Sequence, residues 1–414
     1  MSEIKTVIMQ LAKLLPGLYL GLKPGQPVFV QAGRSHEAFL NLIVKELGRS
    51  GAGEIMVHLV DPDSRPVAQM QLVQEELCQK SVELVASYVR IAGPEGPGFY
   101  AGLKPDERRI LDLSVFRPVG EYRRQIMAGL IPRCILPGPT VEWGKLVYPG
   151  MRPQKAAAQL AADIARFCFL DQDNPEASFL AFDESLEQAR QRLQDLTVRS
   201  LHLEGGGTDL RIQLSPKAIW LTGRKRTPSG RRFYANVPIG EVFTTPLAGA
   251  TEGTVRVTMP TLAGGTEVAG LTLQFSSGRL VDFTAGEGAG SFRDFLATDP
   301  EGGSLYLGEI ALVSMDSPLG AGETFYQEIL VDEKRRSHIA LGEGYTNTIV
   351  GGPTMSPEEL RRNGVNKSSQ HHDLMIGSVE LDITADTYDG RSVPVMSQGR
   401  WTFRQYNQHL KEVG

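Results

Sequence analysis

The sequence has few cysteines, few histidines and no long apolar run. Its 414 residues include 3 cysteines and 7 histidines, and Cys78, Cys134 and Cys168 lie too far apart to form a zinc-ligand spacing. Each cysteine is expected to be a small buried side chain in a reducing compartment. A membrane span needs about eighteen or more apolar residues in a row, and the N-terminal segment, broken by Pro16, lacks a signal-peptide core. These absences predict a cytoplasmic protein without a membrane partner.

The chain also lacks a strong charge of one sign. With 43 basic and 48 acidic residues its formal net charge is −5, which disfavours a nucleic acid as partner. Two short basic clusters, residues 224–226 and 334–336, are flanked by acidic stretches. We expect both clusters to be solvated surface.

Two compact enzyme motifs are absent as well. The local His-Glu-x-x-His pattern of many zinc peptidases does not occur. Gly48, Gly51 and Gly53 lie at the end of a predicted helix and before a predicted strand, which reverses the order that a dinucleotide-binding loop requires. They are better explained as the end of a helix. The candidate metal ligands named below come from distant segments, unlike the local His-Glu-x-x-His pattern.

The first half of the chain alternates between helical and strand patterns. Apolar residues at helical spacing predict helices, and short apolar runs between turn residues predict strands. The predicted helices span residues 5–15, 35–54 and 69–85, and the predicted strands span residues 27–33, 55–63 and 87–94. This alternation with short connections predicts a parallel sheet covered by helices.

The pattern changes after further predicted helices within residues 153–196. The chain that follows is rich in glycine and threonine and alternates polar with apolar residues, and Ser277-Gly278 and Asp389-Gly390 have the chemistry of hairpin turns. We place the domain boundary between residues 185 and 186. The prediction is an α/β N-terminal domain with a parallel sheet over residues 1–185, and an α+β C-terminal domain with mainly antiparallel strands over residues 186–414.

Residues 366–378 read NKSSQHHDLMIGS and place two histidines and an aspartate before a short apolar run. An arbitrary triplet of this kind is usually a polar loop tip. The second domain, however, holds further ligand-type residues beside apolar or glycine-rich segments: Glu241, Glu309, His338, His371 and Asp373. A carboxylate is costly to bury unless it is paired or bound to metal. Mixed oxygen and nitrogen donors suit Zn²⁺, Co²⁺ or Mn²⁺, and this many donors favours a two-metal site, although spacing alone does not show it.

A series of motifs occurs in order between residues 205 and 401: GGGTDL, NVPIGEVFTTP, GTVRVTMP, LGEIALV, SHIALGEGY, NGVNKSSQHHDLMIGS and QGRW. In this order they resemble the aminopeptidase T family of thermophilic metallo-aminopeptidases. The first half resembles the family more loosely, through PGQPVFVQAG and GPTVEWGKLVYPG. Two positions depart from the family pattern. Gly240 stands where the family usually has the first of two consecutive glutamates, and Ser337 stands where it usually has a cysteine.

The resemblance implies a catalytic second domain that holds two divalent metal ions, acts on peptides with a free N-terminus and belongs to a homodimer. The implied metal ligands are two glutamates, two histidines and an aspartate: Glu241, Glu309, His338, His371 and Asp373. His372 is then only the residue between two ligands. Tyr345 and Glu309 are the candidate catalytic residues, and Tyr345 is either a hydrogen-bond donor to the tetrahedral oxyanion or a packed strand residue. The identity of the general base is open: it is either an unliganded glutamate or a carboxylate that bridges the metal ions.

The implied reaction is metal-assisted hydrolysis of the N-terminal peptide bond, with an activated water and a bound substrate α-amine. Ring-cleaving non-haem Fe(II) dioxygenases resemble the same fold and are the alternative, since His338, His371 and Asp373 would supply their two histidines and one carboxylate. Glu241 and Glu309 argue against that alternative because a mononuclear iron site does not require them. A binding protein without catalysis is a third class, and the complete ligand set argues against it.

Overall fold

The computed structural model describes residues 3–320 and 322–403. Residues 404–414, the end of the predicted second domain, lie outside this description. The chain divides into two compact units: Met1–Phe179 with Arg224–Ile239, and Leu180–Gly223 with Gly240–Gly414. The boundary that we placed between residues 185 and 186 falls inside helix α8 (Pro175–Asp195) and stays a prediction.

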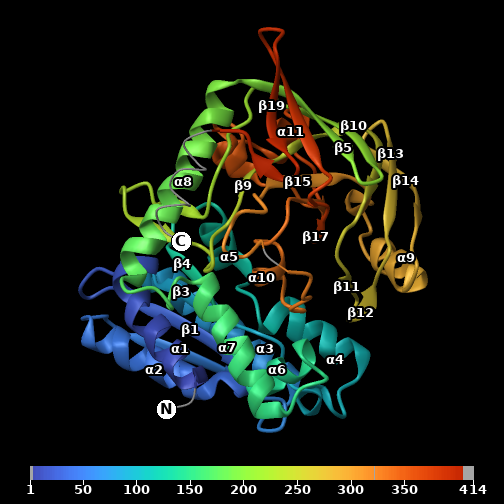
Figure 1. Ribbon diagram of the computed structural model, residues 1–414. Coiled ribbons are helices and arrows are strands. Elements are labelled where there is room, and N and C mark those ends of the chain that lie inside the picture. Colours follow the sequence, from blue (N-terminus) through green and yellow to red (C-terminus); the bar gives the residue numbers. More distant parts are fainter. Residues whose placement is uncertain (1–2, 321, 404–414) are drawn as a thin grey trace. The chain divides into compact units, whose positions relative to one another are not determined.

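The first unit contains a four-stranded parallel sheet. Its strands are β1 (Val28–Gly33), β2 (Ile55–Val60), β3 (Ser87–Ala92) and β4 (Arg133–Pro137). They lie in the order β2-β1-β3-β4. Figure 1 labels β1, β3 and β4. Strand β1 has parallel neighbours on both sides and is buried at every position, which explains its largely apolar sequence VFVQAG. The predicted parallel sheet of an α/β region is confirmed.

Helices cover this sheet. They are α1 (Glu3–Leu14), α2 (Glu37–Arg49), α3 (Val67–Leu84), α4 (Pro105–Ile110), α5 (Gly120–Met127), α6 (Val141–Val147) and α7 (Pro153–Phe167). Helix α2 connects β1 to β2, and α3 connects β2 to β3. Because these two right-handed crossovers run in opposite directions along the sheet, α2 and α3 cover opposite faces. A hairpin of β7 (Arg224–Arg226) and β8 (Arg232–Tyr234) belongs to the same unit.

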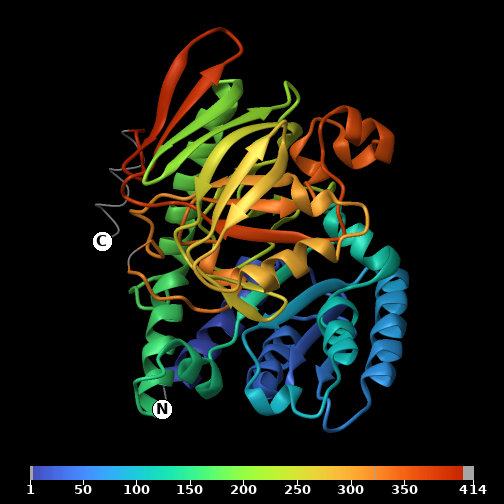
Figure 2. The same cartoon turned by 90° about the vertical axis from the view of Figure 1, so that its right-hand side faces the viewer.

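The second unit contains a large antiparallel sheet, seen in green, yellow and red in Figure 2. Its strands are β5 (Val198–Gly205), β6 (Thr208–Leu214), β10 (Pro246–Arg256), β13 (Thr272–Ser276), β14 (Arg279–Thr284), β18 (Asp382–Thr387), β19 (Ser392–Ser397) and β20 (Arg400–Trp401). The order is β14-β13-β10-β6-β5-β18-β19-β20. Both predicted hairpin turns are confirmed, since Ser277-Gly278 joins β13 to β14 and Asp389-Gly390 lies between β18 and β19. Ser277 and Gly278 both have positive φ, as a tight hairpin turn requires.

A smaller antiparallel sheet in this unit carries the residues of functional interest. Its strands are β9 (Val242–Thr244), β15 (Leu307–Leu312), β16 (His338–Gly342) and β17 (His371–Met375). They lie in the order β17-β16-β15-β9, and β9, β15 and β16 are buried at every position. The unit also contains β11 (Thr261–Ala263), β12 (Thr266–Val268), α9 (Ala289–Ala297), α10 (Ile329–Asp332) and α11 (Pro357–Arg362). The predicted α+β class with mainly antiparallel strands is confirmed.

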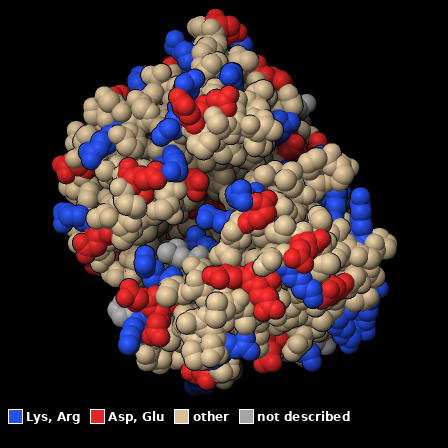
Figure 3. Space-filling model, turned by 180° about the vertical axis from the view of Figure 1, so that it is seen from behind, with Lys and Arg blue, Asp and Glu red and all other residues tan. Residues whose placement is uncertain are grey.

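The basic cluster Lys334, Arg335 and Arg336 is buried, with each residue at most 2% exposed. The prediction that it is solvated surface was wrong. Arg335 and Arg336 donate hydrogen bonds to backbone carbonyls of residues 319–324, and Lys334 pairs with two carboxylates. Charged groups with such partners can be buried. On the face of the molecule shown in Figure 3, basic and acidic side chains are interspersed.

The three cysteines are buried and unpaired, as predicted. Burial raises the pKa of the Cys78 thiol to about 11, so this group stays protonated at neutral pH. None of the helices within residues 3–320 and 322–403 has the length and apolar character needed to cross a bilayer.

Candidate metal centre

The register of the small sheet places two carboxylates in one row. Glu309 on β15 lies opposite Ala340 on β16, and Ala340 lies opposite Asp373 on β17. Residues opposite each other in an antiparallel pair project from the same face of the sheet. Glu309 and Asp373 therefore flank the small side chain of Ala340 on one face.

Both predicted histidine ligands share that face. His338 precedes Ala340 by two positions on β16, and His371 precedes Asp373 by two positions on β17. Side chains two positions apart on a strand project to the same side. Strand alternation therefore gathers four of the candidate ligands, although they come from three segments that are distant in the sequence.

His372 projects to the other face of β17. Its Nε2 lies 3.1 Å from Thr261 Oγ1, and its ring lies 4.7 Å from the ring of Phe295. Burial lowers the pKa of His372 to about 4, which keeps the imidazole neutral. These contacts give His372 a packing environment away from the candidate ligands.

A bulge in β15 directs Glu309. The register shifts between Leu307 and Glu309, at Gly308. A Cβ atom on Gly308 would lie 2.3 Å from the carbonyl oxygen of Glu343 and 2.5 Å from that of Gly342. Only glycine permits so close an approach, and bulges commonly re-aim side chains beside active sites. Gly308 thus sets the direction in which Glu309 leaves the strand.

Each candidate histidine is oriented through its Nδ1 atom. His338 Nδ1 lies 3.1 Å from the carbonyl oxygen of Arg336, and His371 Nδ1 lies 2.8 Å from that of Glu343. A carbonyl can only accept, so each Nδ1 carries the proton and donates it. The neutral ring then presents a lone pair on Nε2, which is the arrangement that metal-binding histidines adopt.

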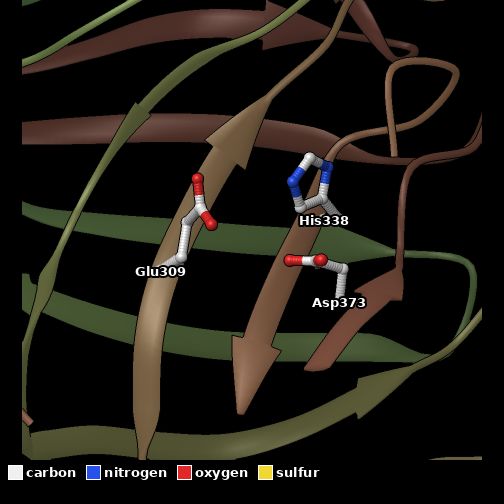
Figure 4. Close-up of side chains that lie close together, drawn as sticks. All are labelled: Glu309, His338 and Asp373. Atoms are coloured by element: carbon white, nitrogen blue, oxygen red, sulfur yellow. The ribbon is translucent and has the colours of Figure 1, made fainter. Parts of the chain in front are cut away.

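All five predicted ligands come together in the structure. One ligand atom each of Glu309, His338 and Asp373 lies within 4.8 Å of the others, and Figure 4 shows their side chains converging from three strands. His371 Nε2 lies 3.0 Å from Glu309 Oε2 and 3.3 Å from Asp373 Oδ1. Glu241, which directly precedes β9, places Oε2 3.6 Å from His338 Nε2. The cluster is continuous, with His338 and Glu241 at one side and His371 at the other.

Three atoms of this cluster form no hydrogen bond among the described residues: Glu241 Oε2, His338 Nε2 and Asp373 Oδ1, although Asp373 Oδ1 is in ion-pair contact with His371. Their residues are between 1% and 7% exposed. Buried polar atoms nearly always have partners, and an unpaired buried carboxylate is costly. A divalent cation would satisfy all three atoms, and carboxylate oxygens with imidazole nitrogens are donors that Zn²⁺, Co²⁺ and Mn²⁺ accept. The residues therefore fit a metal ion.

The electrostatics of the cluster favour a cation. Burial raises the pKa of Glu309 above its ordinary value. Burial would lower the pKa of His371, but Asp373 and Glu309 hold it well above its ordinary value. Burial would raise the pKa of Asp373, but the His371 imidazolium keeps it low. Without a metal the cluster thus retains a proton on His371, which a metal ion must displace.

Two charged residues of the site were not predicted from the sequence. Lys334 forms ion pairs with Glu241 and with Glu333. Burial raises the pKa of Glu333 well above its ordinary value. Burial opposes the Lys334 ammonium, but the two carboxylates raise its pKa above the ordinary value. Their position four to five residues before His338 was the available signal, which the surface-like sequence DEKRR obscured.

Tyr345 reaches the same cluster from the segment that follows β16. Its hydroxyl lies 3.3 Å from His371 Nε2, and its ring lies 5.0 Å from the His371 ring and 5.4 Å from that of Phe243. The Tyr345 backbone N–H donates to Thr245 Oγ1 at 2.9 Å. Burial and the nearby carboxylates raise the pKa of Tyr345 well above its ordinary value, so its hydroxyl stays a hydrogen-bond donor.

The family model for thermophilic metalloproteases (M29) matches residues 4–401, almost the whole chain. The chain belongs to this family. The predicted relation to the aminopeptidase T family and the predicted peptide hydrolase class are confirmed. A divalent metal cofactor follows from the same membership, in agreement with the unpartnered ligand atoms.

Similarity to named relatives extends over nearly the full length. The chain is 31% identical over 402 residues to aminopeptidase AmpS of Bacillus subtilis (strain 168), which covers 95% of this chain and 97% of that one. The solved structure of wild-type AmpT from Thermus thermophilus matches with a TM-score of 0.85 at 29% identity, over 97% of this chain and 100% of that one. The fold of this chain is thus shared with that solved structure.

A more distant structural match concerns the alternative function. The structure of 2,5-dihydroxypyridine dioxygenase from Pseudomonas putida KT2440 matches with a TM-score of 0.50 at 13% identity, over 98% of this chain and 99% of that one. Similarity at this level shows a common fold and nothing about the reaction. The family model and the 31% identity to AmpS therefore decide for a peptidase.

Proposed function

We propose that the protein is a metal-dependent aminopeptidase that removes the N-terminal residue from peptides with a free α-amine. The observation that carries this proposal is the set of unpartnered, buried ligand atoms in a member of a metalloprotease family. The relatives AmpS and AmpT, which cover almost the whole chain, support the aminopeptidase class. The proposed ligands of two divalent ions (Zn²⁺, Co²⁺ or Mn²⁺) are Glu241, Glu309, His338, His371 and Asp373.

Divalent ions at these residues would supply a water with a pKa lowered toward neutrality and would polarise the scissile carbonyl. The protein contributes the direction of the ligands. His338 and His371 are held through Nδ1 by backbone carbonyls, and Gly308 fixes the exit of Glu309 from β15. Such backbone-anchored ligands need little rearrangement when the site is filled.

Two residues have proposed catalytic roles. Glu309 lies inside the ligand cluster, with Oε2 3.0 Å from His371 Nε2, and its carboxylate is placed to take up a proton from the attacking water. Tyr345 keeps its hydroxyl proton and lies at the edge of the ligand cluster. It is placed to donate a hydrogen bond to the oxyanion that forms at the substrate carbonyl.

We also propose that the protein acts in the cytoplasm as a homodimer. The cysteines are buried and unpaired, as suits a reducing compartment. The dimer rests on the relation to the aminopeptidase T family. Sedimentation of the purified protein at low concentration checks it, and a mass near the 45.2 kDa of one chain would contradict it.

The decisive experiment compares the wild type with Glu309→Gln and, as a control, with Glu301→Gln, an exposed carboxylate of the same unit. Bound metal per chain, hydrolysis of aminoacyl chromogenic substrates and oxygen uptake on a dihydroxypyridine are measured. We expect hydrolysis by the wild type and by Glu301→Gln, and loss of metal and hydrolysis in Glu309→Gln. One iron per chain in all three proteins, with oxygen consumed and no peptide cleaved, would contradict the proposal and favour a dioxygenase.

A second test concerns the free α-amine. Acetylation of the substrate N-terminus removes the amine that positions the scissile bond, and lost positioning can cost several kcal/mol of barrier. We expect cleavage of unblocked peptides and almost none of their N-acetylated counterparts. Similar turnover of both would indicate an endopeptidase.

A further inference from the structure

Lys334 places a buried ammonium group inside the candidate metal centre. It is 2% exposed, and its Nζ forms ion pairs with Oε1 of Glu241 and Oε1 of Glu333. Buried ammonium groups are rare without a specific partner because their desolvation is costly. Lys334 is therefore a fixed positive charge, held within reach of the ligands.

Glu241 is shared between this ammonium and the metal ligands. Its Oε1 accepts the hydrogen bond from Lys334 Nζ, whereas its Oε2 lacks a partner among the described residues and lies 3.6 Å from His338 Nε2. By contrast, Glu309 and Asp373 make no ion pair with a lysine or arginine in the described part of the chain; both contact the imidazole of His371. Of the proposed ligands, Glu241 is thus the one whose negative charge a permanent cation already offsets.

The backbone keeps Lys334 in this position. Lys334 is the second residue after the end of α10, and a Cβ atom on Gly240 would lie 2.8 Å from the Lys334 carbonyl oxygen and 3.1 Å from its Cβ. The neighbouring Arg335 is anchored by hydrogen bonds to the carbonyls of Leu319 and Gly322. Since residues on both sides are packed or anchored, the Lys334 side chain has little freedom to swing away from Glu241.

We propose that Lys334 acts as a built-in cation that makes the two metal positions unequal. The position at Glu309, His338 and Asp373 binds its ion tightly, and the position that must draw on Glu241 binds a second ion weakly and exchangeably. The reason is competition, because an ammonium and a divalent ion repel each other and seek the same carboxylate. This inference rests on the proposed two-metal function and adds that the second site is weakened by a residue of the chain itself.

The test is calorimetric titration of the metal-free, full-length protein with Co²⁺, followed by metal analysis after dialysis. For the wild type we expect one tight ion and a second bound about 10- to 100-fold more weakly, the range in which groups that contact metal ligands change affinity. Lys334→Met, which removes the charge and keeps a long unbranched side chain, should strengthen the second site by a similar factor. Lys334→Arg should leave it weak. Lys217→Met, at an exposed lysine of the same unit, should match the wild type.

Lys334→Met leaves Glu241 and Glu333 facing each other without a cation, which can impair folding. The double variant Glu333→Gln/Lys334→Met removes one negative charge together with the positive one and should show the same strengthened second site. Two ions of equal affinity in the wild type would overturn the inference. A second site that stays weak in both Lys334→Met and the double variant would overturn it as well.

Hydrolysis of an aminoacyl substrate by the wild type is measured on the same samples. It distinguishes a failure of the role of Lys334 from a failure of the proposed function. Two equal sites in a protein that cleaves peptides would refute the role of Lys334 and leave the proposed function intact. A protein that binds Co²⁺ but cleaves no peptide would refute the proposed function, on which the inference depends.

Discussion

Each unit of the molecule contains a buried histidine beside a buried carboxylate, and the two pairs differ in how their polar atoms are satisfied. In the first unit His36 and Glu95 are 3% and 7% exposed. His36 Nδ1 lies 3.1 Å from Glu95 Oε1 and its Nε2 lies 2.9 Å from the Gly138 carbonyl oxygen, while the Ser35 N–H donates to Glu95 Oε2. In the second unit His338 Nε2, Glu241 Oε2 and Asp373 Oδ1 have no hydrogen-bond partner within the described residues. The two clusters are thus equally buried, but they differ in their hydrogen-bond partners. The first is a structural pair that is complete within the protein, and the second is a site that needs a ligand.

A single unpartnered atom does not make such a site. His58 in the first unit is 3% exposed, and its Nε2 also lacks a partner among the described residues. Its Nδ1, however, lies 2.8 Å from Gln74 Oε1, and burial lowers the pKa of the ring, which favours a neutral histidine among amides. The candidate metal centre differs from His58 because several unpartnered atoms and several carboxylate charges lie together at one place.

The largest expected effect comes from removing a candidate ligand from one face of β17 and comparing this with removal of the adjacent histidine from the other face. His371→Ala should lower metal affinity or peptide hydrolysis by at least about 10- to 100-fold, the range found even for groups outside the ligand shell. His372→Ala should be much milder, because its ring packs against Phe295 on the other face of β17. Metal titration and hydrolysis of both variants give the comparison. Equal losses, or a larger loss in His372→Ala, would show that the assignment of the two faces is wrong.

The next effect follows from the proton that the metal must displace. Asp373 and Glu309 raise the pKa of His371, so the ring is protonated in the metal-free protein at pH values below that raised pKa. An imidazole must be neutral to bind a metal ion, so affinity should rise with pH by about tenfold per unit while one proton is released from His371, and level off above its pKa. Calorimetry in buffers of different ionisation enthalpy counts the protons. An affinity that is constant between pH 6 and pH 8 would contradict the retained proton.

The sequence predicted the elements that depend on local patterns. The runs that became β1, β2 and β3 and the Ser277-Gly278 turn of the large sheet follow from periodicity and turn chemistry, which act over a few residues. The five candidate ligands were identified through the resemblance to a family, and not from spacing. Their convergence depends on the register of three strands whose pairing is non-local, and no local pattern encodes that register.

The part of the site that the sequence did not reveal is its positive charge. Lys334, Arg335 and Arg336 form a polar run that normally lies in solvent, and their burial depends on partners contributed by distant segments. A charged side chain is predicted to be exposed when its partners are distant in the sequence, because the local pattern does not show those partners. Glu333 and Lys334 were missed for this reason, although they lie only four to five residues before the candidate ligand His338.

A smaller effect, on stability alone, is expected from the structural pair. Glu95→Gln weakens the hydrogen bonds from His36 and Ser35 and leaves buried groups less well satisfied, which typically costs about 1–3 kcal/mol. The thermal midpoint should fall, whereas the affinity for the first metal ion should not change. Glu309→Gln should instead lower the affinity for the metal ion, and its thermal midpoint should fall only by the stabilisation that metal binding confers, so that the metal-free proteins should have similar midpoints. Loss of metal in Glu95→Gln would show that the distinction between the two clusters fails.

The smallest expected effect is the pH dependence of the stability that Glu95 contributes. Burial would raise the pKa of Glu95, but hydrogen bonds from His36 and Ser35 lower it below its ordinary value. A carboxylate with a lowered folded pKa adds stability that is fully present above its unfolded pKa of about 4.3 and is lost as the pH falls through the folded pKa. The difference in thermal midpoint between the wild type and Glu95→Gln should therefore be constant from pH 8 to about pH 5 and should shrink below about pH 4. Glu301→Gln, at an exposed position, serves as the control and should show little difference throughout. A Glu95 contribution that grows in acid would mean that the carboxylate is bound in its protonated form, and that the first unit, like the second, stores a proton in its buried cluster.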